Sequence, residues 1–303
     1  MSHDHNHEIG NYNRAFAIGV LLNIAFVAIE AIYGIFSNSL ALLADAGHNL
    51  SDVVGLLLAW GANVLATKAA TEKRTYGFRK ATVIASLASA VLLLVALGVI
   101  TWEAIGRFSD PKPIEGMTII VVAAIGVVIN TATALLFLKG QKNDLNIRGA
   151  FLHMAADAGV SLGVVVAGIF VIAKDWLWID PVVSLIIVAV ILVSTWGLLR
   201  DSLNYSMDAV PEHVNLPAIK KYFTRLEFVK EIHDLHIWPM STTEVALTVH
   251  IVVNKNSLDN NFLSNIQQHL HDHFGIEHST IQVETSMAEN NCMLDSNKHG
   301  KKG

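Results

Sequence analysis

Long apolar segments constrain the fold of this chain more than any other feature. An α-helix needs about 20 apolar residues to cross the roughly 30 Å hydrocarbon core of a bilayer. Six segments meet this requirement: 14–35, 40–66, 81–106, 115–138, 147–173 and 178–199. Only 16% of the residues are charged, and the mean hydropathy is +0.46, whereas soluble domains carry about 25% charged residues. The sequence therefore predicts a polytopic α-helical membrane protein with six transmembrane helices in a lipid bilayer.

The distribution of Lys and Arg between the connecting segments predicts the orientation of these helices. Cytoplasmic loops of membrane proteins carry an excess of these two residues. One alternate set of loops holds ten of them, namely Arg14, Lys68, Lys73, Arg74, Arg79, Lys80, Lys139, Lys142, Arg148 and Arg200. The opposite set holds three, namely Arg107, Lys112 and Lys174. We therefore expect a multi-pass protein of an inner or plasma membrane, with both termini in the cytoplasm.

The composition changes after about Met207 and indicates a second domain. The pattern that follows predicts a helix, two strands, a second helix and a third strand, at 215–226, 229–238, 244–253, 259–274 and 279–284. That order fits a small α+β domain with helices on one face of a sheet. We expect four parts: a histidine-containing tail at 1–10, a transmembrane domain at 11–207, a cytoplasmic domain at 208–288 and a disordered tail at 289–303.

Two pairs of ionisable residues with the same spacing interrupt the apolar segments. His48 and Asp52 are four residues apart in the second segment, and His153 and Asp157 repeat this spacing in the fifth. Residues at i and i+4 share one face of a helix. Each pair could simply form a hydrogen bond at a helix interface, but intramembrane ionisable residues are rare and usually mark ion pathways. Two imidazoles and two carboxylates suit tetrahedral Zn²⁺, so the four residues are candidate ligands.

Further polar residues lie near these pairs. Asp45 is on a helix face similar to that of Asp52, and we consider three roles for it: a metal ligand or support for one, a step on an exit path, or a hydrogen-bond partner of another helix. Glu30, in the first segment, is a candidate pathway or proton group.

The chain resembles the cation diffusion facilitators, a family of zinc-exporting antiporters, from about Asn11 to Glu284. The matching stretches are SLALLADAGHNLSDVVG, RTYGFRKATV, the HxxxD of the fifth segment and HDLHIW. The resemblance implies a homodimer with six membrane helices per subunit and a ferredoxin-like cytoplasmic domain. It also implies exchange of cytoplasmic Zn²⁺ for protons by alternating access around the four-ligand site. HxxxD in the second segment is similar to the zinc-transporting branch of the family.

The ligand types give this exchange a physical basis. Zinc needs neutral His and ionised Asp, so protons and metal compete for the same lone pairs, and His changes charge near physiological pH. The cargo could also include Cd²⁺, Co²⁺ or Fe²⁺, whereas Mg²⁺ and Ca²⁺ prefer oxygen ligands.

The same resemblance implies metal binding in the cytoplasmic domain. By motif position the matching residues are His233, His250 and Glu284, and the bound ion would be structural or regulatory Zn²⁺. His278 is a candidate partner for a second ion, together with Cys292. The alternative is that histidines on an exposed strand face are simply solvated. The family also implies a charge pair between Lys80 and Asp208 that helps to hold the dimer together.

Other classes of protein fit the sequence less well. No basic block of the kind that binds nucleic acid is present. An intramembrane zinc metalloenzyme would need an open coordination position and usually a general base, and no HExxH occurs. A membrane-bound metal sensor would not need two matched ligand pairs inside the membrane. We therefore expect a transporter rather than an enzyme.

Overall fold

The computed structural model describes residues 24–138, 145–253 and 261–284 of the chain. The chain forms two compact units. The first comprises Met1–Leu58 with Ala88–Leu198, and the second comprises Ala59–Leu87 with Leu199–Gly303.

Five of the described helices are long and apolar enough to cross a membrane. They are α2 (Leu40–Ala66), α3 (Ala81–Ser109), α4 (Gly116–Phe137), α5 (Leu145–Lys174) and α6 (Ile179–Ser206). The predicted first span begins outside the described residues, and its described part is a helix from Ile24 to Phe36. Helix α6 continues seven residues beyond the predicted end at 199, because a helix can extend past the apolar stretch on which the prediction rests.

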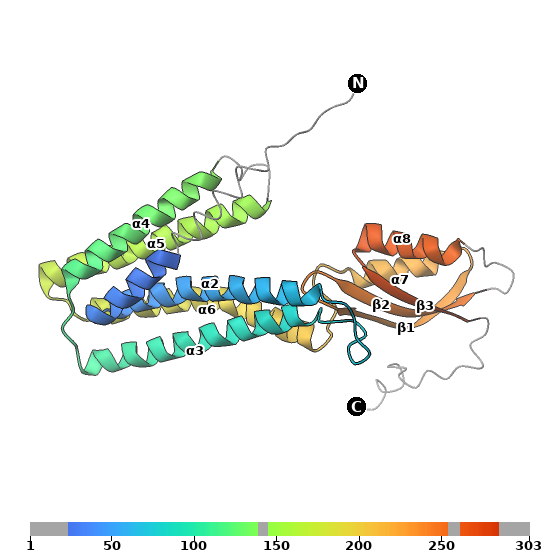
Figure 1. Ribbon diagram of the computed structural model, residues 1–303, viewed down its shortest axis with the longest axis horizontal. Helices are drawn as coiled ribbons and strands as arrows, with labels where there is room; N and C mark the ends of the chain where they lie inside the picture. Colours follow the sequence, from blue (N-terminus) through green and yellow to red (C-terminus); the bar gives the residue numbers. More distant parts are fainter. Residues whose placement is uncertain (1–23, 139–144, 254–260, 285–303) are drawn as a thin grey trace, which may run out of the picture. The chain divides into compact units, whose positions relative to one another are not determined.

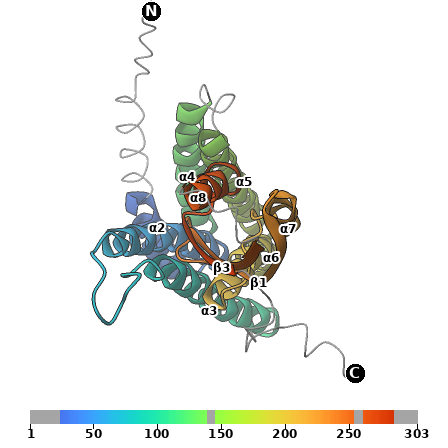
Figure 2. The ribbon, with the colours of Figure 1, turned by 90° about the vertical axis from the view of Figure 1, so that its right-hand side faces the viewer.

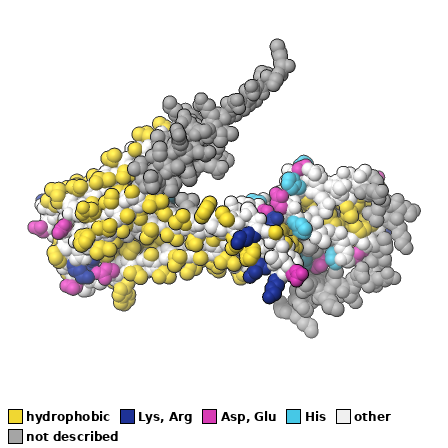
Figure 3. Space-filling view, viewed as in Figure 1, with side chains coloured by type: hydrophobic (Ala, Val, Ile, Leu, Met, Phe, Trp, Pro, Cys, Tyr) yellow, Lys and Arg dark blue, Asp and Glu magenta, His cyan; other side chains and the backbone are white. Residues whose placement is uncertain are grey.

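Large apolar side chains are exposed on the helices, as expected for surfaces that contact lipid. Trp102 is 81% exposed and Val193 is 79% exposed. Figure 3 shows hydrophobic side chains over the visible face of these helices. Charged side chains are visible at the end of these helices where α3 connects to α4, and the connection between the two holds Asp110, Lys112 and Glu115.

Helices α4 and α5 lie side by side because glycines allow their backbones to approach closely (Figure 1). A Cβ atom added to Gly168 of α5 would lie 2.7 Å from Cγ1 of Ile120 and 3.2 Å from the carbonyl oxygen of Gly116. A Cβ added to Gly116 would lie equally close, at 3.2 Å, to the carbonyl oxygen of Gly168. Small residues at such contacts are typical of packed membrane helices.

The cytoplasmic part has the helix and strand order that the sequence predicts. Its elements are α7 (Leu216–Arg225), β1 (Val229–Pro239), β2 (Val245–Val253), α8 (Phe262–Phe274) and β3 (His278–Glu284). The sheet order is β1-β2-β3, with β1 and β2 antiparallel and β2 and β3 parallel. The parallel pairing follows from α8, which crosses over the sheet between these strands. Figures 1 and 2 show α7 and α8 on the same face of the sheet.

Apolar residues of both helices and of the sheet form the core of this domain. Ile219 and Phe223 of α7, and Ile266 and Leu270 of α8, are fully or almost fully buried against the strands. Asn215 caps the N-terminus of α7, since its side-chain oxygen accepts a hydrogen bond from the backbone N–H of Ala218. Helix α8 ends at Gly275, whose φ of 65° is the left-handed conformation common after a helix C-terminus.

Candidate metal centres

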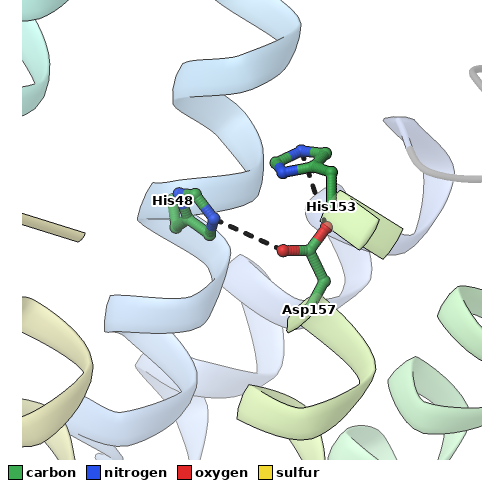
Figure 4. Close-up of side chains that lie close together, drawn as sticks. All are labelled: His48, His153 and Asp157. Carbon is green, nitrogen blue, oxygen red and sulfur yellow. Dashed lines mark ion pairs between the residues drawn. The ribbon is translucent and has the colours of Figure 1, made fainter. Parts of the chain in front are cut away.

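One side-chain cluster lies between α2 and α5 in the helical unit. Nε2 of His48 lies 3.4 Å from Oδ1 of Asp157, and Nε2 of His153 lies 3.7 Å from Oδ2 of the same residue. Figure 4 shows the Asp157 carboxylate between the two imidazoles. The imidazole centroids are 6.0 Å apart, with the rings nearly perpendicular. Each of the three side chains offers one donor atom, and these atoms lie within 4.8 Å of one another.

These three residues fit a divalent transition-metal ion. Asp157 is 2% exposed, and its Oδ2 atom is buried with no hydrogen-bond partner among the described residues. A carboxylate held in this way is costly unless a cation or donor approaches it. Imidazole nitrogen and carboxylate oxygen are both ligands that Zn²⁺ accepts. The cluster therefore supplies three of the four donors that the sequence predicts.

The fourth predicted donor, Asp52, belongs to α2, and its side chain lies outside the described part of the structure. The helical backbone places Asp52 one turn after His48 on the same side of α2. Its participation stays a prediction.

Asp45 makes contact with another helix. It is fully buried, and its Oδ2 atom accepts a hydrogen bond of 2.9 Å from Oγ of Ser161 on α5. Asn49 lies between two carboxylates, since its Nδ2 atom is 3.3 Å from Oε2 of Glu30 and 3.5 Å from Oδ1 of Asp45. Asp45 is therefore a hydrogen-bond partner of α5, one of the three roles considered for it. The sequence did not single out Ser161 or Asn49, because a lone Ser or Asn carries no spacing signal.

A second cluster lies on the sheet of the cytoplasmic domain. Residues His233 and His250 are directly paired across β1 and β2, and Glu284 is the last residue of β3. Nε2 of His233 lies 3.3 Å from Oε2 of Glu284, and Nδ1 of His250 lies 3.0 Å from Oε1. Their donor atoms also lie within 4.8 Å of one another. Within the described part of the chain, Oε2 of Glu284 is buried without a hydrogen-bond partner, as expected of an atom that a metal ion would use.

Asp234 adjoins this second cluster and was not predicted as a site residue. Its Oδ2 atom lies 3.5 Å from Nε2 of His250, and its Oδ1 atom lies 2.9 Å from Nε2 of His236. Asp234 has a φ of 50°, and the β1–β2 pairing shifts register between His233 and His236. Asp234 lies in the sequence HDLH, but regular strand alternation would place its side chain on the other face of the sheet from that of His233. A β-bulge of this kind is not readable from alternation.

The structure does not bring His278 into this cluster. His278 pairs with Ala246, whereas Glu284 pairs with Val252 at the other end of the same strand pair. The ring of His278 contacts Tyr76, with a centroid distance of 5.7 Å. Cys292 lies outside the described residues. A role of His278 and Cys292 in a second ion site stays a prediction.

The expected contact between Lys80 and Asp208 is present within one chain. Nζ of Lys80 forms an ion pair with Oδ1 of Asp208 and donates to the backbone carbonyl of Tyr205. Nearby, Arg79 forms an ion pair with Glu244, which precedes β2. The backbone N–H of Thr242 also donates to Oγ1 of Thr82, at 3.1 Å. The start of α3 is therefore tied to the β1–β2 hairpin inside the second unit.

Apolar helices of membrane-spanning length, with a cluster of two His and one Asp side chain between two of them, are features expected of a membrane transporter for metal cations. Comparison with known families agrees. The chain belongs to the cation efflux family, the cation diffusion facilitators: the model of the cation efflux transmembrane domain matches residues 16–205, and that of the cytoplasmic domain of cation efflux proteins matches residues 211–286. The resemblance seen in the sequence is thereby confirmed.

Several bacterial relatives match along nearly their whole length. The chain is 38% identical to a cadmium, cobalt and zinc/H⁺-K⁺ antiporter of Bacillus subtilis over 287 residues, covering 93% of this chain and 92% of the relative. It is 36% identical to the metal cation efflux system protein CzcD of Cupriavidus metallidurans (95% and 91%). It is 34% identical to the zinc transporter ZitB of Escherichia coli (94% and 93%). The family and these relatives are transporters, so the chain is a metal-cation transporter and not an enzyme.

Proposed function

We propose that this protein is a Zn²⁺/H⁺ antiporter that exports cytoplasmic zinc. The observation that carries the proposal is the position of the Asp157 carboxylate between the imidazoles of His48 and His153. Two nitrogen donors and a buried carboxylate favour a borderline transition-metal ion over Mg²⁺ or Ca²⁺. The names of the relatives cite zinc, cadmium and cobalt, so Cd²⁺ and Co²⁺ are further candidate cargoes, as is Fe²⁺ on ligand type.

Proton exchange follows from the chemistry of the same side chains. A metal-loaded site needs lone pairs on His48 and His153 and an ionised Asp157, and protons compete for all three. Facing a cytoplasm of neutral pH, the site loses protons and binds metal. Facing a more acidic compartment, it binds protons and releases metal. Asp52 is the proposed fourth ligand, and alternating exposure of the site to the two sides links the two half-reactions.

The proposal includes the assembly and its orientation. The protein acts as a homodimer in an inner or plasma membrane with both termini in the cytoplasm, in line with the Lys and Arg distribution. The match of residues 211–286 to the cytoplasmic domain of cation efflux proteins supports this assembly. His233, His250 and Glu284 hold a structural or regulatory zinc ion in that domain. Zinc there would supply a link between β1, β2 and β3.

The test is zinc flux into proteoliposomes with an imposed pH gradient. The parent protein is compared with His153→Ala and Asp157→Ala, and with His213→Ala as a matched control, because His213 is exposed and lies outside both clusters. We expect flux that follows the pH gradient in the parent and the control and is lost in both site variants. Flux that persists in both site variants would exclude the proposed site. Flux that ignores the gradient would exclude proton exchange.

A further inference from the structure

We propose that Asp234 is a positioning residue that holds His250 with Nδ1 directed at the metal ion bound by His233, His250 and Glu284. The inference rests on the proposed cytoplasmic zinc site and adds to it a residue outside the ligand set.

The two nitrogens of His250 face different carboxylates. Nδ1 lies 3.0 Å from Oε1 of Glu284, and Nε2 lies 3.5 Å from Oδ2 of Asp234. A neutral imidazole carries one N–H and one lone pair. If the N–H is directed at Asp234, the lone pair is on Nδ1, on the side of Glu284 and His233. A metal-bound His usually donates its second ring N–H to a carboxylate or carbonyl in this way, which fixes both tautomer and ring orientation.

The backbone of β1 is bent in a way that brings Asp234 to this position. Residues His233 and His250 are paired, and His236 is paired with Thr248, so two residues of β1 oppose the single residue Val249. The φ of Asp234 is 50°. This left-handed conformation is uncommon for residues other than glycine, although Asp and Asn adopt it more readily than most. Local backbone strain of this kind is often retained where a site requires it.

A second contact fixes the carboxylate from the other side. Oδ1 of Asp234 is 2.9 Å from Nε2 of His236, so the carboxylate lies between the imidazoles of His236 and His250. Its side chain is 20% exposed, whereas that of His236 is 52% exposed. His236 is therefore the more exposed of the two imidazoles, and Asp234 is the carboxylate that lies between it and His250.

The experiment measures Zn²⁺ affinity in the full-length protein. Removing the membrane cluster with His153→Ala and Asp157→Ala leaves the cytoplasmic site to be titrated with zinc against a chromophoric chelator. In this background we compare Asp234→Gly, Asp234→Asn and Glu284→Ala. Gly and Asn both tolerate a positive φ, so the bulge is retained, while only Asn keeps an oxygen acceptor for His250. Asp175→Gly is the matched control, because Asp175 also has a positive φ, of 54°, and is remote in sequence from both clusters.

We expect Asp234→Gly to weaken zinc binding by about 10- to 100-fold, the usual effect of removing a carboxylate that orients a metal-bound His. Asp234→Asn should recover most of this affinity, and Asp175→Gly should leave it unchanged. Glu284→Ala should abolish binding. The visible spectrum of bound Co²⁺ and the melting temperature of the metal-free protein are recorded for each variant.

Three results would overturn the proposal. Unchanged affinity in Asp234→Gly would show that His250 needs no such support. Loss of binding in Asp234→Gly and Asp234→Asn as complete as in Glu284→Ala would make Asp234 itself a ligand. The third result has two parts: Asp234→Gly and Asp234→Asn lower the melting temperature of the metal-free protein equally, and the two variants bind zinc with the same affinity. This result would assign Asp234 to the stability of the fold alone. Absence of zinc binding in the background protein would instead remove the proposed cytoplasmic site, while the flux experiment would stand.

Discussion

Nη1 of Arg107 lies 3.6 Å from Oδ2 of Asp180, and both side chains are almost completely buried in the helical unit. Asp180, near the start of α6, also accepts hydrogen bonds from the backbone N–H groups of Leu40 and Ala41, at 2.8 and 3.2 Å. A helix N-terminus has unpaired N–H groups and favours a negative charge. Asp180 thus caps α2 from another helix, and Arg107 balances its charge.

Asp180→Ala should destabilise the protein strongly, because it removes this cap and the only buried carboxylate that Arg107 faces among the described residues. Arg107 then keeps an ion pair with Glu103, which is 42% exposed, and its hydrogen bonds to Asn38. Breaking a buried ion pair costs about 3–5 kcal/mol. Asp180→Asn keeps one carbonyl oxygen as an acceptor for these groups and should cost less. The measurement is the unfolding midpoint in mixed micelles of rising SDS content. Adding Arg107→Met to Asp180→Ala should restore part of the lost stability. If the two substitutions changed the free energy of unfolding in a strictly additive way, Arg107 and Asp180 would not be energetically coupled.

Gly168→Ala should destabilise the helical unit even though Ala is the better helix former. The added Cβ would lie 2.7 Å from Ile120 and 3.2 Å from the backbone of Gly116, so α4 and α5 must separate. Overpacking of this kind typically costs about 1–3 kcal/mol. Gly163→Ala on the same helix is the control, since no atom of the described residues lies within 4 Å of its added Cβ. In the same micelle assay Gly163→Ala should raise the free energy of unfolding by up to about 1 kcal/mol, because Ala is the better helix former. Equal effects at both positions would exclude close packing as the cause.

His48→Asp should change metal preference more than total flux. The substitution replaces an imidazole with a carboxylate beside Asp157 and so favours harder cations such as Mn²⁺ over Zn²⁺ and Cd²⁺. Flux of each metal into proteoliposomes, with and without competing zinc, measures the ratio. We expect the ratio of Zn²⁺ to Mn²⁺ flux to fall by at least about tenfold, which corresponds to 1.4 kcal/mol. An unchanged ratio with reduced flux of all metals would place His48 outside the ligand set.

Acidification should weaken α8 through His269. Partial burial lowers the pKa of His269, and the adjacent charge of His273 lowers it further. The ring stacks on Tyr222, with centroids 4.1 Å apart. The folded domain therefore binds a proton at His269 less readily than the unfolded chain does. The stability that neutral His269 contributes to the folded domain is lost as the pH falls through about 6.5, the pKa of His in the unfolded chain.

His269→Phe keeps a stacking ring that does not titrate. Hydrogen exchange of α8 amides, corrected for intrinsic rates, should therefore depend less on pH between 7.5 and 5.5 in this variant. His271 works in the opposite direction, since its hydrogen bond to Asp272 raises its pKa, but it is solvent-exposed and contributes little. An identical pH dependence in parent and variant would contradict the assignment to His269.

Much of the fold was readable from the sequence because apolar length and strand alternation are local signals. The predicted spans 40–66 and 81–106 correspond to α2 and α3, and all five elements of the cytoplasmic domain occur in the predicted order. The repeated spacing of His153 and Asp157, matching that of His48 and Asp52, likewise indicated a metal site before any contact was known.

Contacts between residues distant in the sequence were not readable. The role of Asp180 as a cap for α2, and the hydrogen bond from Ser161 to Asp45, depend on how helices pack. Position along β3 separates His278 from Glu284, although both flank the same short strand in the sequence. Asp234 was missed because the bulge reverses the face that alternation assigns to it.

By itself, the sequence determined that this chain spans a membrane, carries a small α+β domain and holds paired His and Asp residues within its helices. These properties follow from hydrophobicity and residue spacing, which act over a few turns of chain. Tertiary structure alone decided that Asp157 lies between His48 and His153, and that Asp234 faces His250. Such placements depend on which helix faces meet and where a strand is bulged, and packing free energy across the whole fold sets both.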